Sequence, residues 1–132
     1  RRATSTPVIP PSRSTYLMAV TMFNRIVVLA NNEEGAELRE MTFKEMGIDR
    51  SLSQVIVTDM APLDYVHIPD DALKRIDTLL AERKDKNASA IIPTCASLAI
   101  LLEERGIQNI DGLRVVNPLR ISIRIAEAIC GS

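Results

Sequence analysis

The stretch ASAIIPTCASLA, residues 88–99, carries the clearest fold signal in this chain. Its apolar run predicts a buried strand that ends at Pro93, followed by a helix that begins at Cys95 or Ala96. The N-terminus of a helix carries partial positive charge and unpaired N–H groups, so it stabilises a thiolate and binds anions. Cys95 is therefore a candidate acid, base or nucleophile. Alternatively, it is a small apolar residue packed beneath a loop, as free cysteines often are.

On both sides of this stretch, short β-branched runs alternate with segments of helical period. The pattern predicts strands at 6–9, 26–30, 54–57, 90–92 and 113–116, and helices at 12–22, 33–46, 72–86, 95–105 and 119–129. Ser12 is expected to cap the first helix, and Gly47 and Gly106 to end two others. A longer loop is expected at 60–69. The alternation predicts an α/β fold, a three-layer sandwich with a mostly parallel sheet.

The composition is that of an ordinary globular domain, with 46% hydrophobic and 25% charged residues. Aromatic residues make up 3%, and the basic residues are scattered at a net charge of −1, which argues against a nucleic-acid or membrane partner. We expect a cytoplasmic setting with two free thiols, Cys95 and Cys130, because no signal segment or long apolar run is evident. The chain begins with Arg1 rather than Met, as expected of a fragment or a processed product.

The loops that follow the predicted strands are the expected ligand site, because parallel α/β sheets bind ligands at the carboxyl ends of their strands. Backbone N–H groups of Ala96 and Ser97 are placed to hold a carboxylate, and Thr94 or Ser97 can add a hydroxyl donor. Taken singly, Thr94 and Ser97 fit an ordinary helix cap better than a binding role. The cluster around Cys95 is the stronger signal.

Three asparagines and the lone histidine are further candidates. Asn31, Asn32 and Asn117 offer side-chain amides to a substrate, or simply turn the chain. His67 has no second His or Cys at metal-ligand spacing, so no metal site is expected. Cys130 falls near the end of the last predicted helix, where the helix dipole disfavours a thiolate. Gly-rich phosphate loops are absent from the sequence.

Two motifs resemble a known family. Residues 91–99, followed by Val115-Val116-Asn117-Pro118 and an Ala-rich helix, resemble the Asp/Glu/hydantoin racemase superfamily. The similarity is greatest to the hydantoin racemase branch, in which one strand ends in Gly-Cys-Ala and a later one in Asp-Pro. It covers nearly the whole chain and corresponds to the C-terminal half of such an enzyme.

The resemblance implies one lobe of a two-lobe, pseudo-symmetric fold with the active site between the lobes. Residues 1–112 would form the second-lobe domain that carries Cys95, and residues 113–132 a final strand and helix that return to the first lobe. The implied activity is a cofactor-independent racemase or isomerase in which two thiols, one from each lobe, act as acid and base on a carbon next to a carbonyl. The implied substrate is a small carboxylate or a hydantoin-like molecule.

Cys95 matches the second-lobe cysteine of this family, and the first-lobe cysteine has no counterpart here. The chain alone is therefore expected not to racemise, and its implied partner is a first lobe or a second copy in a homo-oligomer. The family also contains decarboxylases and maleate isomerases, and Asn117 stands where hydantoin racemases carry Asp. A non-catalytic module that binds an anion or a protein through the same loops is the alternative from a different class.

Overall fold

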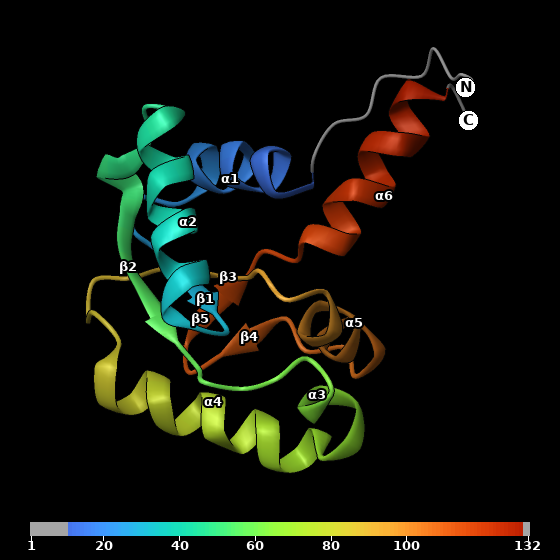
Figure 1. Cartoon of the computed structure of the whole chain (residues 1–132). Helices are drawn as coiled ribbons and strands as arrows, with labels where there is room; N and C mark the ends of the chain where they lie inside the picture. The colour runs from blue at the N-terminus through green and yellow to red at the C-terminus, as the bar shows by residue number, and fades with distance from the viewer. Residues whose placement is uncertain (1–10, 131–132) are drawn as a thin grey trace.

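The computed structural model describes residues 11–130, so the predicted strand at 6–9 lies outside the described residues (Figure 1). The helices are α1 (Pro11–Met22), α2 (Glu33–Glu45), the 3₁₀ helix η1 (Asp49–Ser51), α3 (Asp64–His67), α4 (Pro69–Arg83), α5 (Ala96–Glu104) and α6 (Pro118–Ile129). The strands are β1 (Ile26–Ala30), β2 (Leu52–Val57), β3 (Ala90–Pro93), β4 (Asn109–Ile110) and β5 (Leu113–Val115). Every helix within residues 11–130 is too short or too polar to span a bilayer.

Within the described residues, five strands form one sheet in the order β2-β1-β3-β5-β4. β1 pairs in parallel with β2 and β3, β3 pairs in parallel with β5, and only β4 runs antiparallel. Val28 of β1 lies in register between Val55 and Ile92. All residues of β1 are buried, as expected for a central strand covered on both faces. The predicted mostly parallel α/β sheet is confirmed.

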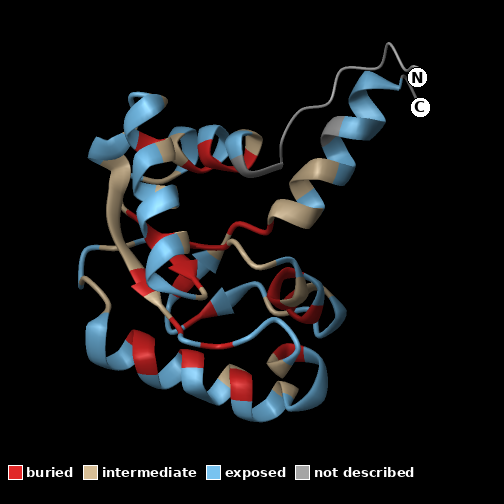
Figure 2. Ribbon diagram, viewed as in Figure 1, coloured by how far each residue is buried: buried red, intermediate tan, exposed pale blue. Residues whose placement is uncertain are grey.

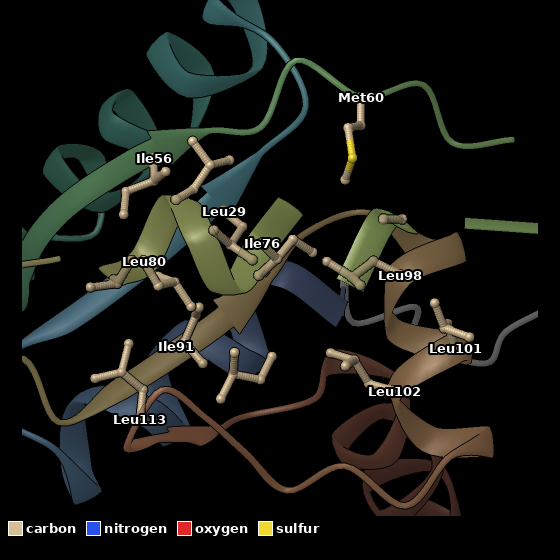
Figure 3. Packing of buried hydrophobic residues seen from close by; sticks show 14 of the residues in the cluster. Leu29, Ile56, Met60, Ile76, Leu80, Ile91, Leu98, Leu101, Leu102 and Leu113 are labelled. Carbon is tan, nitrogen blue, oxygen red and sulfur yellow. The ribbon is translucent and has the colours of Figure 1, made fainter. Parts of the chain in front are cut away.

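Helices cover both faces of the sheet, which makes three layers (Figure 1). Ile26 and Val28 pack in a cluster with α1 and α2, whereas Val27 and Leu29 pack in a second cluster with α3, α4 and α5. Because successive side chains of β1 point to opposite faces of the sheet, they contribute to two separate hydrophobic cores. The buried residues gather on the sheet and on the helix sides that face it (Figure 2). Figure 3 shows the second cluster, with Leu80 of α4 beside the strand residues.

Two local predictions were wrong. The first helix begins at Pro11, so Ser12 lies inside the helix rather than at its cap. The predicted loop at 60–69 contains a one-turn helix, α3, in which Asp64 accepts a hydrogen bond from the backbone N–H of Ala61 at 3.0 Å. A single helical turn is too short to show a 3.6-residue period, so the sequence pattern carried no signal for it.

The sequence pattern also missed the hairpin that β4 and β5 form at the edge of the sheet. Its turn is Asp111-Gly112, and both residues have positive φ, 49° and 81°. Two successive positive φ values are the mark of a type I′ turn, for which Asp-Gly is a preferred pair. Because β4 has two residues, it is too short to show the alternation of apolar and polar residues that predicts a strand.

Helix α6 projects from the sheet and contacts α1 and α5 (Figure 1). Most of its described side chains are exposed, including Ile123 at 52% and Ile129 at 47% (Figure 2). β5, which precedes it, pairs with β3 inside the common sheet. The division of the chain at residue 112 stays a prediction.

A hydrogen-bond network next to the start of β1 connects the segment after α4 to β2 and to the residue before β1. Asp85, which follows α4, accepts hydrogen bonds from the guanidinium of Arg25 at 2.8 Å and from the Ser53 hydroxyl at 2.7 Å. The backbone N–H of Asn87 donates to the same carboxylate at 3.0 Å. These bonds, first among them the one from Asn87, lower the pKa of Asp85 from 3.8 to about 2.

Replacing Asp85 by asparagine is expected to destabilise the fold in a pH-dependent way. The folded-state pKa lies below the unfolded one, so the ionised carboxylate contributes stability above pH about 4, and that contribution is lost as the pH falls towards about 2. Urea unfolding across this range should show wild type and Asp85→Asn diverging above pH about 4 and converging near pH about 2. Asp77→Asn, at an exposed position of α4, is the matched control. A stability difference that is independent of pH would contradict the assignment.

Candidate active site

The point where β1 and β3 lie side by side is the expected ligand crevice, because the strand order reverses there. Asn31 and Asn32 follow β1, and Thr94 and Cys95 follow β3. All four line one cavity of about 140 Å³ at the carboxyl ends of these strands, together with Arg39 and residues near the start of α2. The structure thus brings together four of the residues that the sequence singled out.

Cys95 stands at the N-cap of α5, and the helix itself begins at Ala96. Its backbone is extended and its side chain makes no capping hydrogen bond. The first N–H groups of α5 therefore have no side-chain oxygen over them. Cys95 is a free thiol and half-buried. Its neighbour Thr94 donates its hydroxyl proton to the carbonyl oxygen of Leu29 at 2.6 Å, which fixes the loop after β3 against β1.

A second cavity, of about 450 Å³, lies next to the first. Thr94, Cys95 and Arg39 border both cavities. Tyr16 from α1 and Ser122 from α6 also line the larger cavity. The rest of its wall consists of small or apolar residues, namely Ile92, Pro93, Ala96, Ala99, Ile100, Pro118 and Leu119. Cys95 thus lies where a polar recess meets a largely apolar cavity.

Two buried tyrosines stand near these groups. Burial raises the pKa of Tyr16 above its usual range, against the opposing effect of the Arg39 guanidinium. Burial also raises the pKa of Tyr65 on α3, where the Thr58 hydroxyl acts in the opposite direction and the negative charge of a Cys95 thiolate adds to the rise. Both tyrosines are therefore neutral O–H donors near neutral pH, and Tyr65 lies within electrostatic range of Cys95.

Asn117 holds α6 in place through both ends of its amide. Its Oδ1 accepts a hydrogen bond from the N–H of Leu119 at 2.9 Å, and its Nδ2 donates to the carbonyl of Ala99 at 2.9 Å. Asn117 is buried and lines neither cavity. Its position indicates a structural cap, so we leave it out of the proposed substrate contacts.

The remaining candidates divide in the same way. Asn32 caps α2 by accepting a hydrogen bond from the N–H of Gly35 at 2.8 Å, while Asn31 lines the small cavity without a capping role. Ala96 lines the larger cavity and Ser97 lines neither.

The other sulfur and imidazole groups lie elsewhere. His67 is exposed at the end of α3, and Cys130 is exposed at the C-cap of α6. Across residues 11–130, no three His, Cys, Asp or Glu side chains are grouped to hold a metal ion.

Sequence reasoning did not single out Tyr16, Arg39, Tyr65 or Ser122 as residues near the site. One signal was available: Asn32, Gly35 and Arg39 recur at i, i+3 and i+7, so they share the side of α2 that faces the crevice. The hydroxyl of Tyr16, which is fully buried on α1, was another signal, because a buried hydroxyl needs a partner.

A search of solved structures finds a match to the crystal structure of allantoin racemase from Pseudomonas fluorescens. The TM-score is 0.69 at 19% sequence identity, over 97% of this chain and 55% of that one. Over the matched region, the chain has the same fold as that racemase.

The match confirms the α/β fold that the resemblance implied, whereas the two-lobe arrangement stays a prediction. No family model matches the sequence, and no curated protein matches it. The chain spans 55% of the length of the allantoin racemase, so the likeness concerns about half of that structure.

Proposed function

We propose that this chain forms part of a racemase or isomerase that acts at a carbon next to a carbonyl group, with Cys95 as one of its acid/base groups. The observation that carries this proposal is the place of Cys95. It opens α5 at the reversal point of the sheet, in a racemase-like fold, and borders both cavities.

The chemistry requires a base on one face of the reacting carbon and an acid on the other. The Cys95 thiolate takes the proton and becomes a thiol, and the electron pair of the broken C–H bond moves to the carbonyl oxygen. The resulting enolate oxygen needs hydrogen-bond donors. The first N–H groups of α5 and the guanidinium of Arg39, a residue that lines both cavities, are the proposed donors. A proton delivered to the opposite face then completes the inversion.

The group on the opposite face is proposed to come from outside the described residues. Cys130, the other thiol, sits at the exposed end of α6 and lines neither cavity. A first lobe or a second copy of the chain would supply the opposing thiol. One base suffices to exchange the proton, but two are needed to invert the centre.

Proton exchange in D₂O, followed by NMR together with optical rotation, tests this function. Allantoin, the hydantoin of valine, and valine itself are suitable probes, with protein-free samples as the blank. The 132-residue chain is expected to exchange the α-proton of one enantiomer without racemising it. Absence of exchange above the blank with every probe, by folded protein, would contradict the function. Racemisation would show that an opposing group is already present and would overturn the one-thiol argument.

A further inference from the structure

Tyr16 and Arg39 bring two buried polar atoms together behind the wall of the larger cavity. Among residues 11–130, Tyr16 Oη and Arg39 Nε are both buried and have no hydrogen-bond partner of ordinary length and angle. Tyr16 comes from α1 and Arg39 from α2, and both residues line the cavity of about 450 Å³. Buried polar groups are almost always hydrogen-bonded. A phenol oxygen accepts and a guanidinium N–H donates, so these two groups can complete each other.

The packing of Tyr16 on α2 brings its hydroxyl to Arg39. The Tyr16 ring lies on the ring of Phe43, with 4.5 Å between the centroids. Arg39 and Phe43 are four residues apart on α2, so their side chains lie on one side of the helix, one turn apart. Burial raises the pKa of Tyr16, and the Arg39 guanidinium opposes this rise through its charge and through hydrogen bonding. The Tyr16 side chain therefore contacts α2 at Phe43 with its ring and at Arg39 with its hydroxyl.

The position of Arg39 matters for the proposed chemistry. Arg39 borders both cavities together with Thr94 and Cys95, and its guanidinium is a proposed donor to the enolate oxygen. Donors stabilise a developing charge best when they are already in place. An arginine side chain has many rotamers, so fixing it costs conformational entropy. A partner at Nε fixes the plane of the guanidinium and leaves its two terminal nitrogens for other contacts.

We propose that Tyr16 is a positioning residue, whose hydroxyl accepts a hydrogen bond from Arg39 Nε and holds the guanidinium where the two cavities meet. The Tyr16 hydroxyl does not touch the substrate, because it is buried. The effect of Tyr16 on proton exchange rests on the proposed function. The hydrogen bond itself requires only the packing of α1 against α2, which Tyr16 and Phe43 share in one core cluster.

The rate at which the Arg39 Nε–H proton exchanges with water tests the hydrogen bond directly, by NMR on the ¹⁵N-labelled full chain. Arg39→Gln assigns the signal by removing it. Tyr16→Phe keeps the ring on Phe43 and is expected to speed this exchange by about fivefold or more, because the acceptor is lost. Tyr65→Phe is the matched control. Tyr65 is also buried but belongs to the core on the other face of the sheet, so the exchange should be unchanged.

A double-mutant cycle on the exchange of the substrate α-proton tests the positioning role. We expect Tyr16→Phe to lower this rate by about threefold to tenfold when Arg39 is present. In the Arg39→Gln background the same change should have no effect, because the group that Tyr16 holds is gone. A merely structural role of Tyr16 would lower the rate by the same factor in both backgrounds. Urea unfolding confirms that each variant is folded.

An unchanged Arg39 Nε–H exchange rate in folded Tyr16→Phe would overturn the proposal, and so would equal losses of activity in the two Arg39 backgrounds. Faster Nε–H exchange in Tyr16→Phe, in a protein that exchanges no substrate α-proton, would leave the hydrogen bond standing and defeat the proposed function. Substrate α-proton exchange by the wild type, with Nε–H exchange unchanged in Tyr16→Phe, would do the reverse.

Discussion

Replacement of Cys95 by alanine is expected to lower α-proton exchange by about 10²–10⁴-fold, the usual contribution of a positioned general base. The thiol stands at the N-cap of α5 and borders both cavities, where a bound substrate can reach it. Alanine removes the base but leaves the helix, because the Cys95 side chain makes no capping hydrogen bond there. The measurement is the rate of deuterium incorporation by NMR, at equal concentrations of folded wild type and variant.

Cys130→Ala is the matched control for this experiment. It removes the other thiol from the exposed end of α6 and should leave the exchange rate unchanged. Equal losses in both variants would point to a general effect of thiol removal. An exchange rate in Cys95→Ala close to that of wild type would assign the base to another residue.

The second large effect concerns stability. Leu80 of α4 is fully buried in the cluster between the sheet and α3, α4 and α5, and Leu80→Ala is expected to lower the free energy of unfolding by about 2–5 kcal/mol. The loss combines removed apolar contact with the cavity left behind. Urea unfolding by circular dichroism measures it.

Leu38→Ala is its matched control, because Leu38 is also helical but 53% exposed on α2. Its effect should stay within about 0.5 kcal/mol. Similar losses in the two variants would show that α4 does not pack on the sheet as described. Because Leu80 lines neither cavity, proton exchange per folded molecule should be the same in both variants.

Much of the fold could be predicted because most of its strands and helices are long enough to show a pattern of apolar residues in the sequence. β1 is apolar throughout, as expected of a strand that is buried on both faces of the sheet. The short elements gave no such signal: α3 is a single turn and β4 has two residues. Their positions depend on a turn and on an Asp64 hydrogen bond rather than on a repeating pattern.

The candidate site was predictable only where topology alone brings residues together. Asn31 and Cys95 meet because they follow neighbouring parallel strands. Tyr16, Arg39 and Ser122 meet because three helices pack around one cavity, and no local pattern encodes that packing. Asn117 also follows a strand, yet its amide is hydrogen-bonded to the backbone of Leu119 and Ala99. These hydrogen bonds could not be predicted from the sequence.

The most direct test of the account is the alkylation of both cysteines by iodoacetamide near neutral pH, with mass mapping to separate the two sites. The account predicts that Cys95 reacts faster than Cys130, although Cys95 is half-buried and Cys130 is exposed. Cys95 stands at a helix N-terminus, which carries partial positive charge, and Cys130 at a helix C-terminus, which carries partial negative charge, and the prediction is that this difference outweighs the difference in exposure. Faster labelling of Cys130, or an inert Cys95 in folded protein, would contradict the assignment of Cys95 as an acid/base group.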